Sequence, residues 1–137
     1  MGQQQLLLII LGVIIVGIAI AVGLQLFQAG SIGANQDAIV NDVMNIAAHA
    51  DQYRIRPTTM GGGGGEFDDY TVPARLEETG NGRVTAQSAA GNVFSVTMES
   101  ISYPGSTVQL TYTPDPSADT ATEGDEQYVW VFGGLFE

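Results

Sequence analysis

The sequence predicts an α+β protein in which one long N-terminal α-helix is followed by a C-terminal antiparallel β-sheet of about four strands. Three observations predict this fold class. An uninterrupted apolar run extends from Leu6 to Leu24, an amphipathic helical pattern follows it to about Tyr53, and polar and apolar residues alternate in the last third of the chain. We expect an apolar helix at 1–30, an amphipathic helical half at 31–56, a Gly-rich crossing loop at 57–69 and a β-rich head at 70–137.

The apolar run has the length and composition of a membrane-spanning helix. At a rise of about 1.5 Å per residue it is roughly 28 Å long, close to the roughly 30 Å thickness of a bilayer's hydrocarbon core. A secretory signal peptide is less well supported, although Ala19-Ile20-Ala21 resembles a cleavage site. No Lys or Arg precedes the run, and its apolar character continues to Phe27. We therefore expect a helix that resides in the membrane.

The second helical pattern places its apolar residues on one face and its polar residues on the other. Asp37, Asn41, Asn45 and Gln52 share the polar face. Arg56-Pro57 should end the helix, because proline lacks an amide donor and disfavours helical geometry in the preceding residue. Gly30 and Gly33 mark a joint between the two halves. The residues expected to pack the helix onto the head are Ile39, Val43, Ile46, Ala50 and Tyr53.

The composition restricts the classes of partner and chemistry. The chain of 137 residues has 15 Asp and Glu against 4 Lys and Arg, a net charge of -11, so direct binding of nucleic acid is not expected. It has no cysteine, and a small domain without disulfides often depends on oligomerisation. The single histidine, His49, lies beside the apolar face and is interpreted as a packing residue. We expect no enzyme activity, no cofactor and no metal site.

Alternation predicts the strands of the head. Arg83–Gln87, Phe94–Glu99 and Val108–Tyr112 are expected strands, and Tyr103-Pro104-Gly105-Ser106 is the turn of a hairpin. Tyr70–Val72 is a possible short strand. The final run, Tyr128–Phe132, is continuously apolar, which predicts a strand covered by the helix on one face and by a neighbouring subunit on the other.

Two segments between these elements invite functional interpretations. Gly61–Gly65 is an unbroken glycine run, but no Lys-Ser or Lys-Thr follows it, so a phosphate-binding loop is disfavoured. We expect this run to lie close against the helix or a neighbouring subunit. Pro114–Gln127 contains five carboxylates whose spacing does not match a calcium loop, so we interpret it as a solvated acidic loop.

The N-terminal pattern resembles that of type IV pilins, the subunits of bacterial and archaeal pilus filaments. The resembling residues are Met1-Gly2-Gln3-Gln4-Gln5, the apolar residues from Leu6 to Gly17, and the amphipathic continuation to Tyr53. The resemblance implies removal of a leader by prepilin peptidase, N-methylation of Met1, and a filament core built from the apolar helix. The expected core residues are Gln5, Leu6, Leu7, Ile9, Ile10, Val13, Ile14, Gly17, Ile20, Leu24 and Phe27.

The sequence departs from this family at one position. Type IV pilins usually have glutamate as the fifth mature residue, where it pairs with a neighbouring N-terminal ammonium, and this chain has Gln5. Processing after Gly2 would place Leu7 there, so the glutamate is absent in either register. We interpret Gln3, Gln4 and Gln5 as a polar plug of amide donors and acceptors that replaces the ion pair.

The resemblance implies a structural function: a major pilin that polymerises into an extracellular type IV pilus-like filament. The partners would be other copies of the chain, the cytoplasmic membrane before assembly, prepilin peptidase and the pilus assembly machinery. Roles in cell adhesion and motility are common for such filaments. The alternatives are a single-pass membrane-anchored binding module and a minor pseudopilin of a type II secretion-like system.

Overall fold

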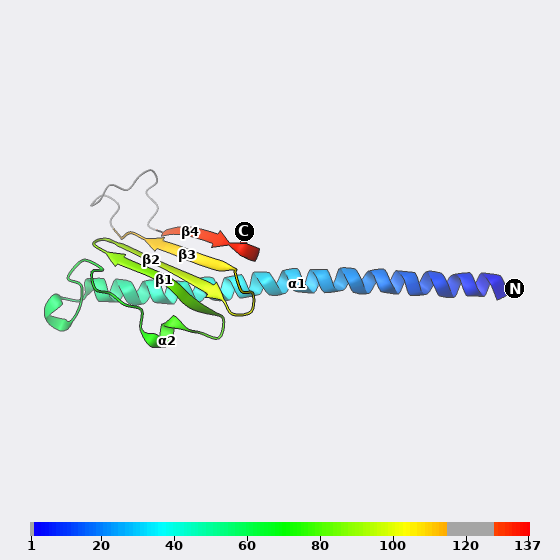
Figure 1. Ribbon diagram of the computed structural model, residues 1–137, viewed down its shortest axis with the longest axis horizontal. Helices are drawn as coiled ribbons and strands as arrows, with labels where there is room; N and C mark the ends of the chain where they lie inside the picture. The colour runs from blue at the N-terminus through cyan, green and yellow to red at the C-terminus, as the bar shows by residue number, and fades with distance from the viewer. Residues whose placement is uncertain (1, 115–127) are drawn as a thin grey trace. The chain divides into compact units, whose positions relative to one another are not determined.

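The computed structural model describes residues 2–114 and 128–137 (Figure 1). Its elements are α1 (Gly2–Ile55), η1 (Thr58–Met60), α2 (Ala74–Glu77), β1 (Gly82–Ala90), β2 (Val93–Ser100), β3 (Thr107–Tyr112), β4 (Tyr128–Gly133) and η2 (Gly134–Phe136). The chain divides into two compact units, Met1–Gly33 and Ala34–Glu137. The predicted α+β fold, a long apolar N-terminal helix followed by a four-stranded antiparallel sheet, is confirmed.

A single helix covers both helical patterns of the sequence. α1 continues through Gly30 and Gly33, and the boundary between the two compact units falls directly after Gly33. It ends at Ile55, two residues before Pro57, as the proline predicts. The amide of Arg56 still donates to the carbonyl of Gln52, at 3.3 Å, and completes the last turn.

The sheet is an antiparallel meander with the order β1-β2-β3-β4. β2 and β3 form the predicted hairpin, with Phe94 opposite Tyr112 and Glu99 opposite Thr107. β1 is longer than predicted, and its register with β2 shifts between Val84 and Ala86. That irregularity is a β-bulge, which bends a strand locally and increases its twist.

The core of the second unit lies between one face of the sheet and one stripe of α1. Side chains of β2 and β3 alternate between buried and half-buried, as expected for strands with one covered face. Phe94 is fully buried in this core, and Phe67 from the loop that follows α1 packs its ring 5.8 Å from the Phe94 ring. The remaining core side chains are Ile39, Val43, Ile46, Ala47, Ala50, Tyr70, Val72, Val96, Met98, Val108, Leu110, Tyr112 and Phe136.

The predicted short strand at Tyr70–Val72 is wrong. Tyr70 donates its amide to the carbonyl of Phe67, at 3.0 Å, and Val72 donates its amide to Oε1 of Gln87, at 3.0 Å. A turn and a side chain therefore occupy these amides, which a strand would give to a neighbouring strand. Both side chains are nevertheless buried, so the apolar pattern of the segment reported core packing rather than strand geometry.

The glycine run folds back over the C-terminal end of α1. The amides of Gly63, Gly64 and Gly65 donate to the carbonyls of Tyr53, Arg56 and Arg54, at 2.9, 3.0 and 2.8 Å. Carbonyls at a helix C-terminus have no partner within the helix, so the run satisfies them. A Cβ on Gly62 would collide with the backbone of Arg56, the residue directly after α1, which explains why this close approach requires glycine. The predicted contact with the helix is therefore made at its end.

Candidate assembly interface

The large apolar side chains of the N-terminal half of α1 are all exposed. Between Leu6 and Phe27 each of them is 48–77% exposed. The most apolar window of α1 has a mean hydropathy of 3.2, and none of that window is buried within the chain. This helix is long and apolar enough to cross a membrane. The first unit thus presents apolar surface that the chain itself does not cover.

The predicted filament-core residues lie on one broad side of this half of α1. Successive residues of an α-helix are about 100° apart, so the predicted set spans an arc of about 200°. The remaining side holds other exposed apolar residues, Leu8, Leu11, Ile15 and Val22. Gln5 is exposed in the second turn, next to the apolar run, and Met1 lies outside the described residues. Contacts of these side chains with other copies, and methylation of Met1, stay predictions. The exposed members of the set are Gln5, Leu6, Leu7, Ile9, Ile10, Val13, Ile14, Gly17, Ile20, Leu24 and Phe27.

The glycines in this half of α1 have no packing role within the chain. A Cβ added to Gly12, Gly17 or Gly23 would meet no atom within 4 Å. Glycine in a helix interior costs about 1 kcal/mol relative to alanine. In apolar surroundings small residues allow helices to approach closely. Their presence is consistent with a partner helix outside the chain.

The C-terminal half of α1 uses its apolar stripe inside its own unit. Ile39, Val43, Ile46 and Ala50 are completely buried in the core of this unit. Tyr53 is half-buried at the end of the stripe, where its hydroxyl donates to the Asp68 carbonyl at 3.0 Å. The predicted packing residues therefore lie together, on the helix face that meets the core.

Polar contacts at three levels of α1 connect it to the head, and sequence reasoning missed all of them. Ser100 donates its hydroxyl to Oδ1 of Asn35 at 2.6 Å. At the second level, Oδ2 of Asp42 accepts a hydrogen bond from the Thr79 hydroxyl at 2.8 Å and another from the side-chain amide of Asn81 at 2.9 Å. Asn35 and Asp42 lie beside the apolar stripe of the helix. That position was the sequence signal for these contacts, because polar residues beside an apolar stripe lie at the margin of a buried face.

The third contact involves a buried tyrosine, Tyr112, whose pKa is raised. The Tyr112 hydroxyl donates to Oδ1 of Asp51 at 3.2 Å, and its ring stacks on Tyr128 with the centroids 4.7 Å apart. Burial, reinforced by the negative charge of Asp51, raises the pKa of Tyr112 to about 12. Tyr112 therefore stays a neutral hydrogen-bond donor throughout the physiological range.

His49 makes a comparable contact on the same half of α1. Its Nδ1 lies 2.9 Å from the Tyr70 hydroxyl, and burial raises the pKa of Tyr70 to about 12. Burial first, and then the charges of Arg75 and Arg56, lower the pKa of His49. The ring nitrogen and the phenol hydroxyl therefore form a hydrogen bond whose direction depends on the tautomer of the ring. This arrangement agrees with the interpretation of His49 as a packing residue.

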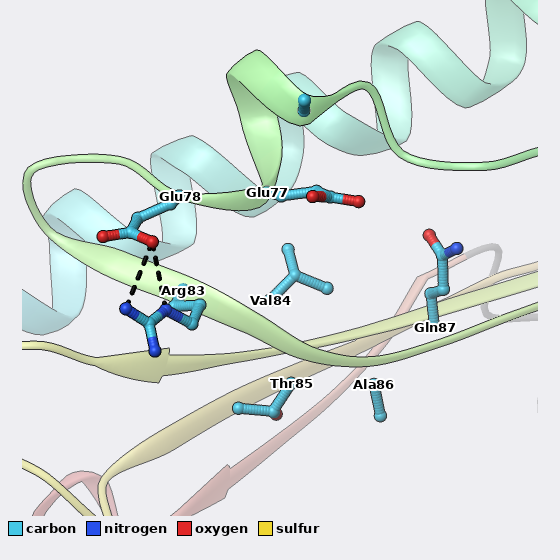
Figure 2. Close-up of a pocket in the computed structure, with 8 residues that line it drawn as sticks. Glu77, Glu78, Arg83, Val84, Thr85, Ala86 and Gln87 are labelled. Atoms are coloured by element: carbon cyan, nitrogen blue, oxygen red, sulfur yellow. Dashed lines mark hydrogen bonds and ion pairs between the residues drawn. The ribbon is translucent and has the colours of Figure 1, made fainter.

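A shallow groove of about 400 Å³ lies between α2 and β1 (Figure 2). Figure 2 shows the side chains of Val84 and Gln87 on the side of β1 that faces Glu77, while Thr85 and Ala86 point to the other side of the strand. The guanidinium of Arg83 pairs with the Glu78 carboxylate at 3.1 Å, and both side chains are largely exposed. An exposed pair of this kind contributes little to stability. We assign no chemistry to this groove.

The acidic loop predicted at Pro114–Gln127 lies outside the described residues beyond Pro114. Its interpretation as a solvated loop stays a prediction. Comparisons with protein-family models, with curated proteins and with solved structures find no match to this chain. The functional proposal therefore depends on the chain's own chemistry.

Proposed function

We propose that this chain is the major structural subunit of a type IV pilus-like filament, which polymerises through the N-terminal half of α1. One observation supports this proposal above the others: a single helix has one half whose apolar stripe is buried in its own unit and another half that is apolar and exposed all round. The C-terminal half of α1 needs no further partner. The N-terminal half must be covered by lipid or protein.

The hydrophobic effect supplies the driving force for both states of the subunit. Covering a large apolar side chain is worth about 1.5–3 kcal/mol, so leaving the whole set from Leu6 to Phe27 in water costs on the order of tens of kcal/mol. The unassembled subunit would reside in the cytoplasmic membrane, where lipid covers the helix. In the extracellular filament, neighbouring copies of the same helix would replace the lipid. Dissociation of single subunits into water would be negligible.

Replacing lipid by protein requires helices that pack closely. Lipid tails are as apolar as leucine, so burial alone does not favour a helix bundle over a bilayer. Gly12, Gly17 and Gly23 leave open space beside the helix, where a neighbouring backbone would approach. The energy of assembly would thus come from close packing, with extraction from the membrane performed by the pilus assembly machinery after prepilin peptidase has processed the chain.

Gln5 is the proposed polar contact of the subunit's N-terminus. It is exposed directly before the apolar run of α1, and an unpaired amide in an apolar interior is unfavourable. In the filament, Gln3, Gln4 and Gln5 would accept hydrogen bonds from a neighbouring N-terminal ammonium. We expect Gln5→Leu to reduce the filament yield and Gln5→Glu to preserve it. A normal yield from Gln5→Leu would contradict this role.

Electron microscopy of the fraction sheared from the cell surface tests the proposal. We expect helical fibres whose only protein, by mass spectrometry, is this chain, with N-methylmethionine at its first residue. A single-pass membrane-anchored binding module would instead remain in the membrane fraction and give no fibres. A minor pseudopilin would be a rare component of fibres built mainly from another chain. Either result would contradict the major-subunit proposal.

A further inference from the structure

The two edges of the sheet differ in their protection against pairing with another strand. β1 at one edge contains a bulge between Val84 and Ala86, has the charged Arg83, and is approached by Glu78, which forms a bridge with Arg83. Bulges, charges and covering segments are the usual devices that prevent an edge strand from pairing with another chain. The β1 edge is therefore protected.

Among the residues that the structure describes, β4 at the other edge has none of these devices. Within residues 2–114 and 128–137, β4 pairs only with β3. Figure 1 shows β4 at the edge of the sheet beside β3. Its register with β3 has no shift, and Tyr128–Gly133 contains neither a charged residue nor a proline. A flat, apolar, unprotected edge strand is a site for pairing with a further strand.

The side chains of β4 strengthen this contrast. Val129 and Val131, opposite Thr111 and Gln109 of β3, lie on the sheet face away from the core and are 44% and 53% exposed. On the core face, Trp130 and Phe132 are only half-buried, with their rings stacked 6.4 Å apart. β4 thus has incompletely covered apolar side chains on both faces as well as an edge with which no described strand pairs.

We propose that β4 pairs with β4 of a second copy of this chain, antiparallel and across a two-fold axis. Residues directly opposite in an antiparallel pair lie on the same face, so the core face of one sheet continues into that of the other only in certain registers. With Trp130 opposite Trp130, Val129 lies opposite Val131 and Tyr128 opposite Phe132. Every pair is then apolar on both faces, which makes the strand complementary to itself.

This pairing deepens the proposed function, and its consequence for filaments rests on that function. A two-fold contact closes on itself and does not propagate, so it would join subunits of two neighbouring filaments rather than extend one filament. A single six-residue strand pair is weak. Filaments that present β4 repeatedly would sum many such contacts, so the outcome is lateral bundling. The charge of -11 on each copy opposes the contact, and salt should therefore promote it.

Cysteine cross-linking tests the pairing, because the chain contains no cysteine of its own. In the variant with both Val129→Cys and Val131→Cys, the thiol at position 129 would lie opposite the thiol at position 131 of the second copy, close enough for a disulfide. The matched control, Ala86→Cys with Ser88→Cys, places two exposed thiols at the same spacing on the β1 edge. On mild oxidation of the full-length protein we expect at least about tenfold more covalent dimer from the β4 variant. Equal yields from the two variants would overturn the proposal.

Bundling gives a second readout that does not depend on cross-linking. In electron micrographs at raised salt, Val131→Lys should convert bundles into single fibres, while Ser88→Lys on the β1 edge should leave the bundles intact. Bundles that persist in Val131→Lys would contradict the pairing. If the chain forms no fibres, the filament proposal fails, and cross-linking of the concentrated detergent-solubilised chain still decides the β4 contact.

Discussion

The two halves of α1 have the same backbone geometry and opposite relations to their surroundings. In the C-terminal half, one stripe is buried in the core of its unit and polar contacts hold its margins, while Asn41, Asn45 and Gln52 remain in water. In the N-terminal half no side is polar and no large apolar side chain is buried. Secondary structure alone therefore does not determine what a helix contacts. What a helix contacts depends on how much of its circumference is apolar, because apolar side chains must be buried against protein or lipid.

The largest effect should come from placing a charge in the apolar half. Ile14→Asp should abolish the filament and reduce retention in the membrane, since a charged residue at the centre of a membrane helix costs about 2.5–3.5 kcal/mol. The head should unfold at its normal temperature, because Ile14 belongs to the other compact unit. Fibre yield and thermal unfolding by circular dichroism measure the two effects, with Ile14→Leu as the control. A normal fibre yield from Ile14→Asp would show that this half needs no apolar cover.

A cavity in the C-terminal half of α1 should lower the stability of the head and leave membrane retention unchanged. Ile46 is completely buried, so Ile46→Ala should lower the free energy of unfolding of the head by about 2–5 kcal/mol. Met44, two residues away, is 39% exposed, and Met44→Ala should cost well under half as much. Chemical denaturation of the detergent-solubilised chain measures both. Membrane retention should be unchanged in each variant, and equal destabilisation would contradict the assigned burial.

The polar margin of the C-terminal half should contribute less than its core. Asp42→Ala removes the acceptor of both Thr79 and Asn81 and should cost about 1–3 kcal/mol. Asp37 lies on the exposed face of the same helix, and Asp37→Ala should change the stability by less than about 0.5 kcal/mol. The same denaturation experiment separates them. Indistinguishable midpoints would mean that the Asp42 contacts do not stabilise the head.

The smallest effect at neutral pH concerns Tyr112 and appears only in alkali. Its pKa is about 12 in the folded chain against an ordinary value of 10.0, so the unfolded chain loses the proton first as the pH rises. The stabilising contribution is complete below pH 10 and is lost between about pH 10 and 12. Tyr112→Phe should flatten this decline in a series of unfolding measurements against pH. A decline that is unchanged in Tyr112→Phe would assign it to other groups, such as Tyr70.

The parts of this fold that follow one periodic pattern could be predicted from the sequence. The apolar run predicted the N-terminal half of the helix, and the stripe from Ile39 to Ala50 and the alternation in β2 and β3 each report burial directly. Tyr70–Val72 failed because side chains can be buried without a strand, as the hydrogen bond from Val72 to Gln87 shows. The short α2 and the Asp42 contacts were missed because they depend on segments that meet only after folding.

The candidate interface likewise has one part that the sequence could predict and another that it could not. The sequence alone could predict that the residues from Leu6 to Phe27 need an apolar cover, because that need follows from composition. It also predicted that a neighbouring subunit would cover one face of β4, but not that the β4 edge would lack protection, since this depends on its position at the sheet edge and on its unshifted register with β3. The protection of β1 by its bulge is equally invisible in the sequence, because alternation continues on both sides of Thr85.

The most direct test of the central claim measures what surrounds the apolar half in the assembled state. A nitroxide label on a cysteine placed in turn at Ile9, Val13, Ile14 and Ile20 reports by electron paramagnetic resonance whether oxygen, which dissolves in lipid, or a water-soluble relaxing agent reaches each position. In sheared surface material we expect all four labels to be immobile and inaccessible to both agents, because neighbouring helices cover them. Free access of oxygen at every position would place the helix alone in lipid and contradict the account.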